Sequence, residues 1–177
     1  PEPELTSAGT PMAKHDLLVA PYNDLETTRR IVARHGGDLA AIIMEPLQRC
    51  TPPKDGFLEG VRSLCDEAGL LLVFDEVVTG FRLAYGGAQE YYGVVPDLAA
   101  FGKIMGGGYP LAVVMGRSNI LAVFDRGSSE TDSYVNQIGT LNGNPIACAA
   151  GLATLAVLRE EGVYQRLRAT GSRLRQA

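Results

Sequence analysis

The stretch LLLVFDE, from Leu70 to Glu76, decides the fold of this 177-residue chain. Its five apolar residues in a row are typical of a strand that is buried on both faces, as in a parallel sheet covered by helices. The stretch ends directly in two carboxylates, Asp75 and Glu76. Ligands of open α/β sheets bind at the carboxyl ends of such strands, so a carboxylate at this place is a candidate site residue.

Segments of strand length and of helix length alternate on both sides of this stretch, which is the pattern of βαβ units. We therefore predict an α/β fold, with a largely parallel sheet and helices on both of its faces. The strands are expected at residues 17–20, 40–44, 70–74, 97–101 and 111–115. The helices are expected from a cap at Asn23 to Gly36, from Phe57 to Gly69 and from Asn144 through Leu158, with a loop between Tyr85 and Gly93.

The composition limits the classes of partner. A net charge of −4 leaves no basic face for nucleic acid and no polybasic patch for a membrane surface. No apolar run approaches the roughly 20 residues that span a bilayer, and the first residues are not those of a signal peptide. Three cysteines without CxxC spacing and two histidines suggest neither disulfides nor a metal site. We expect a cytoplasmic protein that binds a small molecule, and the missing initiator methionine indicates a piece of a longer chain.

Two residues at expected strand ends have the chemistry of a catalytic site. Lys103 lies between apolar residues and beside glycines, so its amine would be partly desolvated, which favours use as a nucleophile. Asp75 could keep the ring nitrogen of a pyridine cofactor protonated. Taken singly, Lys103 can equally be a surface lysine, and Asp75 a helix cap or a member of a buried ion pair. They lie 28 positions apart, which allows one crossover and lets both strand ends face one pocket.

The segment GTLNGNP, from Gly139 to Pro145, offers main-chain N–H groups and a hydroxyl just before an expected helix. Such groups at a helix N-terminus suit a phosphate, although an ordinary capped turn has the same composition. The nucleotide motif GxxxxGK[ST] is absent from the sequence, and no GxGxxG follows a strand. ATP and dinucleotides are therefore not favoured as ligands.

Taken together, these motifs resemble the class III aminotransferase family in order and spacing. The resemblance covers nearly the whole chain from Pro21 onward, and within the family it is closest to the glutamate-1-semialdehyde 2,1-aminomutases. The family motifs are FDEVVTGFR (74–82), GGAQ (86–89), PDL (96–98), GK (102–103), GGG (106–108) and GTLNGNP (139–145), and the aminomutase motifs are APYND (20–24), GFLEG (56–60), YGGAQ (85–89) and GTL (139–141). The family implies the type I fold of pyridoxal-phosphate (PLP) transferases, with a mostly parallel central sheet flanked by helices. Residues 1–177 would then form the central part of its cofactor-binding large domain, without the N-terminal segment and the C-terminal small domain.

The resemblance also implies roles for five residues. Lys103 would hold PLP as an internal aldimine and shuttle the substrate proton. Asp75 would pair with the pyridinium nitrogen of PLP, and Val77 would pack against the face of the ring. Thr140 would contact the cofactor phosphate of a neighbouring subunit, which implies a homodimer with shared active sites. Glu45 would lie beside the cofactor as a hydrogen-bonding neighbour.

The reaction implied is the transfer of an amino group, and several versions of it stay open. An aminomutase moves the group within one carbon skeleton, whereas an intermolecular aminotransferase passes it from an amino acid or amine to a keto acid. A PLP racemase or epimerase on the same scaffold is a further alternative. The alternative of another class is a noncatalytic α/β binding or assembly module, against which the combination of Lys103, Asp75 and Thr140 argues. We expect the 177-residue piece by itself to be inactive.

The loop at residues 47–53 bears on the substrate. Many ω-amino-acid aminotransferases carry a glutamate near the position of Cys50, and this chain does not. Its absence disfavours substrates of the ornithine or 4-aminobutyrate type. Arg49 in the same loop could bind a substrate carboxylate or remain a solvated loop arginine.

Overall fold

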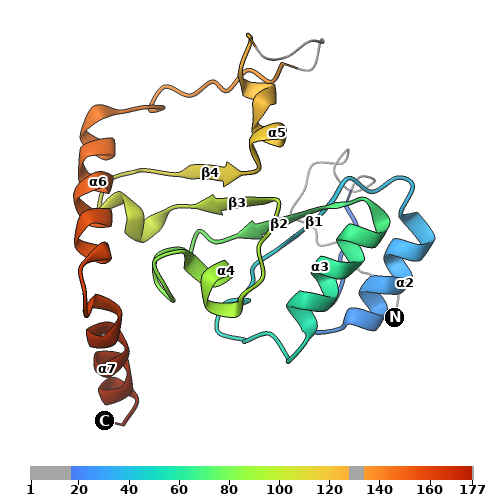
Figure 1. Cartoon of the computed structure of the whole chain (residues 1–177), viewed down its shortest axis with the longest axis horizontal. Helices are drawn as coiled ribbons and strands as arrows, with labels where there is room; N and C mark the ends of the chain where they lie inside the picture. Colours follow the sequence, from blue (N-terminus) through green and yellow to red (C-terminus); the bar gives the residue numbers. More distant parts are fainter. Residues whose placement is uncertain (1–16, 128–133, 177) are drawn as a thin grey trace.

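The centre of the computed structural model, which describes residues 17–127 and 134–176, is a four-stranded sheet in the order β1-β2-β3-β4 (Figure 1). The first three strands are parallel, and β4 is antiparallel to β3. The predicted α/β fold with a mostly parallel sheet is thus confirmed. The strands are β1 (Ala41–Met44), β2 (Leu71–Asp75), β3 (Leu98–Phe101) and β4 (Val113–Gly116).

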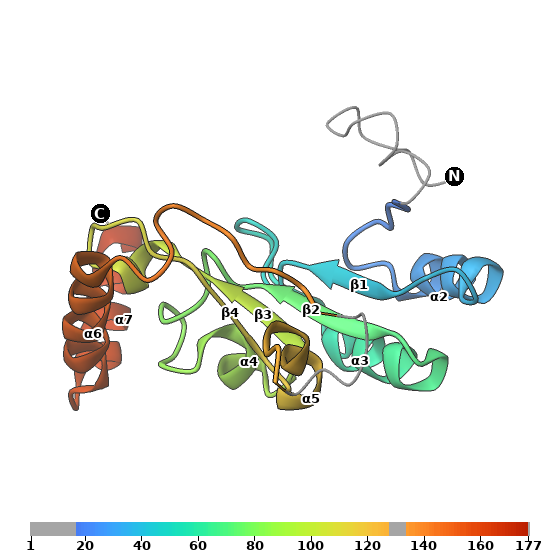
Figure 2. The same ribbon diagram turned by 90° about the horizontal axis from the view of Figure 1, so that it is seen from above.

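One face of the sheet packs against helices (Figure 2). On this side lie α3 (Phe57–Ala68) and α4 (Gly87–Tyr92), and α2 (Leu25–His35) packs against α3. The core between sheet and helices contains Leu72 and Phe74, both fully buried. On the other face Ile43 and Val114 are 65% and 57% exposed. In the part of the chain that the structure describes, the helices expected on both faces therefore cover one face.

The C-terminal helices stand at one end of the sheet (Figures 1 and 2). The first of them, α6 (Pro145–Arg159), packs against the 3-10 turn η1 (Lys103–Gly106), which follows β3. After it comes α7 (Val163–Gln176). The remaining short elements are α5 (Ser118–Leu121) and the 3-10 turn η2 (Ala122–Phe124). The turn that carries Lys103 is thus supported by a long helix.

Two local predictions at the start of the described chain are wrong. Residues 17–20 form no strand, because they make no hydrogen-bond ladder and instead line a cavity beside β1. The cap of α2 is Asp24, not Asn23: a carboxylate oxygen of Asp24 accepts a hydrogen bond from the Thr27 N–H at 2.9 Å. Asn23 has a left-handed φ of 63°, and its side chain binds the main chain of Pro52 and Lys54.

The expected loop at residues 85–93 contains the helix α4, which has no local capping signal in the sequence. Its first turn has no side-chain cap of its own. Its N–H groups at Ala88 and Gln89 instead donate to the carboxylate of Glu76, 12 and 13 residues earlier. A cap from a distant segment is not visible in a local pattern. Two other predicted helix ends are correct: Gly69 ends α3 in the left-handed conformation, and Asn144 caps α6.

Candidate active site

Asp75 and Lys103 lie at the same edge of the sheet. Asp75 is the last residue of β2 and pairs in register with Ala100 of β3. Beyond it, the Glu76 N–H donates to the Ala100 carbonyl at 2.9 Å. Because the two strands are parallel, their carboxyl ends meet at one edge, and Lys103 begins the turn just after β3. The expectation that the two strand ends face one region is thus met by the backbone.

The backbone at Lys103 is strained. Its φ is +47°, in the left-handed region that non-glycine residues rarely adopt. The following turn is pressed against α6: a Cβ on Gly107 would lie 3.1 Å from the Ala150 carbonyl oxygen, and a Cβ on Gly151 would lie 2.5 Å from Leu111 Cδ2. Close packing at these glycines thus supports the turn in which Lys103 has an unfavourable conformation. The Lys103 side chain itself is exposed, not partly desolvated as expected.

Val77 connects the two strand ends. Its N–H donates to Asp75 Oδ1 at 3.0 Å, which fixes the direction of that carboxylate. Its side chain lies against the turn of Lys103, because a Cβ added to Gly102 would be 3.6 Å from Val77 Cγ1. Carboxylate, apolar side chain and lysine turn are therefore neighbours at one edge of the sheet.

A cavity of about 500 Å³ extends from Asp75 along β1. Glu45, directly after β1, lines it together with Asp75, Gln48 and the segment 17–22. Glu45 is held by Arg49: Oε2 accepts the Arg49 N–H at 3.1 Å, and Oε1 lies 3.6 Å from Arg49 Nε. The structure thus brings Glu45 and Asp75 to one cavity.

Thr140 does not join this group. It is exposed, in the turn that precedes α6, and it does not line the cavity of Asp75. At the start of α6, Asn144 Oδ1 accepts hydrogen bonds from the N–H groups of Ile146 and Ala147, both at 3.1 Å. The first turn of α6 thus has a capping residue within the chain, and the role of Thr140 toward a neighbouring subunit stays a prediction.

Glu76 has a structural role that differs from the role of Asp75, and the sequence analysis did not distinguish the two. Its side chain is fully buried and accepts hydrogen bonds from Thr79 Oγ1 at 3.0 Å, the N–H of Ala88, and the N–H and side-chain amide of Gln89. The signal that could have found it is strand alternation: successive side chains point to opposite faces, so two adjacent carboxylates cannot both face one ligand. Glu76 binds α4 to the end of β2.

At the other end of the sheet, Asp97 forms a charged cluster. It accepts from the Leu72 N–H, from Arg62 Nη1 (both 2.8 Å) and from Arg117 Nη1 (2.9 Å). Burial raises the pKa of Asp97, but these hydrogen bonds and the charge of Arg62 outweigh it and lower the pKa to about 2. The cluster lies at the start of β3, away from the carboxyl edge, so we assign it to stability.

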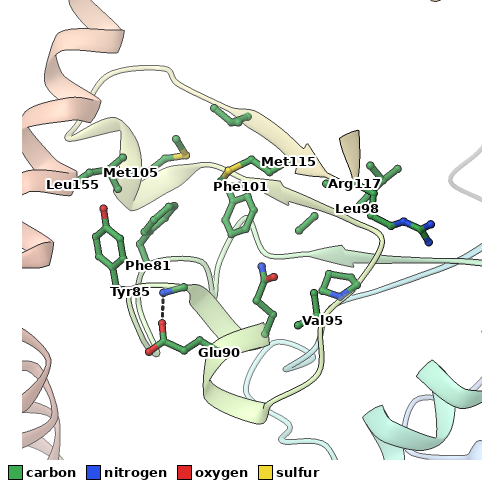
Figure 3. A pocket seen from close by; sticks show the side chains of 16 residues that line it. Phe81, Tyr85, Glu90, Val95, Leu98, Phe101, Met105, Met115, Arg117 and Leu155 are labelled. Atoms are coloured by element: carbon green, nitrogen blue, oxygen red, sulfur yellow. Dashed lines mark hydrogen bonds between the residues drawn. The ribbon is translucent and has the colours of Figure 1, made fainter. Parts of the chain in front are cut away.

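A second, larger cavity of about 930 Å³ lies between α4 and the strands β3 and β4 (Figure 3). Its walls are mainly apolar, with Phe81, Phe101 and Met115 among them. Its charged members have partners already: Glu90 accepts from the Gly86 N–H, and Arg117 is paired with Asp97. None of the candidate site residues lines it. The cavity beside β1 is therefore the one that candidate site residues line, namely Glu45 and Asp75, whereas Val77 and Lys103 line neither cavity.

A mostly parallel α/β sheet with an aspartate and a lysine at adjoining carboxyl ends is typical of an enzyme domain that binds a small molecule. The family model "Aminotransferase class-III" matches residues 4–177. The chain belongs to the class III aminotransferase family, as the sequence motifs predicted.

Curated relatives include two glutamate-1-semialdehyde 2,1-aminomutases. That of Citrifermentans bemidjiense is 48% identical over 166 residues, which cover 91% of this chain and 38% of the relative. That of Pelotomaculum thermopropionicum is 49% identical over 176 residues, which cover 97% of this chain and 39% of the relative. The chain thus spans about two fifths of the length of these relatives, and the predicted likeness to aminomutases is confirmed.

Solved structures of transaminases share the fold. An omega-transaminase from Sphaerobacter thermophilus is 38% identical, with a TM-score of 0.78 over 86% of this chain and 35% of that one. A structure described as a transaminase with PLP bound is 28% identical, with a TM-score of 0.80 over 90% of this chain and 38% of that one. Within residues 17–127 and 134–176, no helix is long and apolar enough to cross a membrane, and no three metal-ligating side chains cluster.

Proposed function

We propose that this chain supplies the lysine, the aspartate and the apolar ring contact of a PLP-dependent enzyme that transfers amino groups in the manner of glutamate-1-semialdehyde 2,1-aminomutase. Residues 1–177 form the central part of its cofactor-binding large domain. The enzyme acts in the cytoplasm as a homodimer with shared active sites, and its substrate is a small amino acid or amine.

The observation that carries this proposal is the meeting of Asp75, Val77 and the Lys103 turn at the carboxyl edge of parallel strands β2 and β3. The set fits PLP chemically, because it combines an acid for a pyridine nitrogen, an apolar group for a ring face and an amine for an aldehyde. A noncatalytic module would have no use for a strained lysine beside an oriented carboxylate. The fit therefore favours the enzyme over the binding module.

PLP, when bound, supplies an electron sink that stabilises negative charge on the substrate carbon bearing the amine. Asp75 holds a proton on the ring nitrogen by its negative charge. Lys103 would hold the cofactor covalently, and its amine would accept and return the proton of the substrate carbon. Val77 would pack against the ring, and Glu45 would lie beside the cofactor as a hydrogen-bonding neighbour. Thr140 binds the phosphate of a partner subunit.

Identity of 48% and 49% to aminomutases supports transfer within one carbon skeleton over intermolecular transfer. The two reactions differ in their need for a second substrate. An aminomutase turns over glutamate 1-semialdehyde with no keto acid added, whereas an aminotransferase stops after one turnover per site until a keto acid is supplied. The solved omega-transaminase at 38% identity is the reason to test the second reaction.

The experiment uses the full-length protein in which this sequence occurs. The protein is loaded with PLP, reduced with borohydride, digested and mapped by mass spectrometry. We expect a pyridoxyl group on Lys103, and its absence from Lys103 in the wild type would overturn the proposal. Turnover of glutamate 1-semialdehyde is then measured with and without a keto acid, with Lys103→Ala as the inactive control.

A further inference from the structure

Arg49 lies in a tight turn directly after the strand that carries Glu45. The turn is closed by a bridge between Gln48 and Thr51, with the Thr51 N–H donating to the Gln48 carbonyl at 2.8 Å. Arg49 occupies its corner with φ of 59°, in the left-handed region where glycine or asparagine is usual. The turn itself does not require a long cationic side chain at this position. A function of the Arg49 side chain would explain why an arginine occupies it.

Glu45 fixes the position of this arginine. One carboxylate oxygen accepts the Arg49 N–H at 3.1 Å, and the other lies 3.6 Å from Nε. The Arg49 side chain is nevertheless 87% exposed. Its terminal Nη nitrogens make no hydrogen bond to another described residue, so the two donors of the guanidinium fork are available to a ligand. Glu45 thus holds the main-chain N–H and Nε of Arg49, and the two Nη nitrogens remain accessible.

The charge of the cavity indicates what the exposed guanidinium of Arg49 could bind. Among the described residues that line the cavity, Glu45 and Asp75 are acidic and none is basic. A substrate carboxylate that entered such a cavity unaided would be repelled by both. Arg49 stands one ion-pair distance from Glu45 and supplies the positive charge that the lining lacks.

We infer that Arg49 binds a carboxylate of the substrate at the mouth of this cavity, and that the enzyme therefore selects amines that also carry a carboxylate. The inference rests on the proposed function, because it takes the cavity of Asp75 as the substrate site. A guanidinium binds a carboxylate through two parallel N–H bonds, which lysine cannot reproduce. Arg49 is accordingly a specificity-determining residue, and the chemistry at Lys103 does not depend on it.

The test is a binding measurement on the full-length, PLP-loaded protein. The ligands are levulinate, a five-carbon keto acid, and its methyl ester, which lacks the charge. Isothermal titration calorimetry compares the wild type with Arg49→Met, Arg49→Lys and a control, Arg34→Met, in which an exposed arginine of α2 is removed. We expect Arg49→Met to weaken levulinate binding about 10- to 100-fold, the range of a charge-assisted hydrogen-bonded pair, and to leave ester binding unchanged. Arg49→Lys should retain part of the affinity, and Arg34→Met all of it.

Equal weakening of acid and ester binding, or levulinate binding within twofold of the wild type in Arg49→Met, would overturn the inference. So would a wild type that binds acid and ester equally. Borohydride labelling of Lys103 is measured in parallel on the wild type and on Arg49→Met. A wild type without the label refutes the proposed function, whereas normal labelling with unchanged levulinate binding refutes only the role of Arg49.

Discussion

The carboxylate of Asp75 accepts a hydrogen bond from the N–H of Val77, two residues further along the chain, at 3.0 Å. This bond uses Oδ1 and orients the side chain. Oδ2 makes no hydrogen bond to another described residue and is free for a ring nitrogen. The same short turn thus places the acid for one edge of a cofactor ring and the apolar side chain for its face.

Replacement of Asp75 by asparagine should separate charge from geometry. The amide oxygen can still accept the Val77 N–H, so we expect a free energy of unfolding within about 0.5 kcal/mol of the wild type. Without the negative charge the ring nitrogen loses its proton, and kcat should fall by on the order of 100- to 1000-fold, the cost of losing one preorganised electrostatic partner. Steady-state kinetics and urea unfolding of the same preparation check both halves. A variant with near-normal kcat would remove Asp75 from the site.

Glu76→Gln should be costly to stability, because the buried carboxylate accepts four hydrogen bonds. A glutamine places an NH₂ donor against N–H donors, and we expect a loss of about 2–4 kcal/mol in the free energy of unfolding. The matched control is Glu67→Gln on the surface of α3, whose ion pair with Arg29 is exposed and is worth roughly 0–1 kcal/mol. Urea unfolding measures both variants, and equal effects would refute the structural role of Glu76.

The strained turn of Lys103 depends on close packing with α6, and Gly151→Ala tests this. The new Cβ would lie 2.5 Å from Leu111 Cδ2 and 3.2 Å from the Met105 carbonyl oxygen, so the Leu111 side chain must shift and the turn at Met105 must give way slightly. We expect a loss of about 1–3 kcal/mol in the free energy of unfolding, together with slower borohydride labelling of Lys103. Gly37→Ala is the control, because a Cβ there meets no atom within 4 Å. If both variants behave alike, the packing does not support the turn.

The sequence predicted those parts of the fold and of the site that depend on neighbouring residues. A buried apolar run ending in Asp75, the glycines around Lys103 and the cap at Asn144 are local signals, and the structure has each in its predicted place. The cap of α4 by Glu76 depends on a contact between separate segments, and the exposure of Lys103 depends on whether other segments cover its turn. No periodicity records such contacts, which is why these features were missed.

The pH dependence of stability should report the cluster at Asp97. Its pKa in the folded protein is about 2, below the ordinary value of 3.8 that the unfolded chain retains. A depressed pKa stabilises the folded state above pH 4, and this contribution is lost as the pH falls from about 4 to 2, because the unfolded chain takes up its proton first.

The shift corresponds to about 2 kcal/mol for this buried group. Asp97→Asn cannot lose this contribution on acidification, although it is less stable at pH 7 because Arg62 and Arg117 both lose their ion pair with Asp97 and Arg62 keeps only its pair with Asp66. Urea unfolding between pH 7 and pH 2 should therefore show the difference in free energy between wild type and Asp97→Asn narrowing below pH 4. A difference for Asp97→Asn that is constant with pH would show that Asp97 has no depressed pKa.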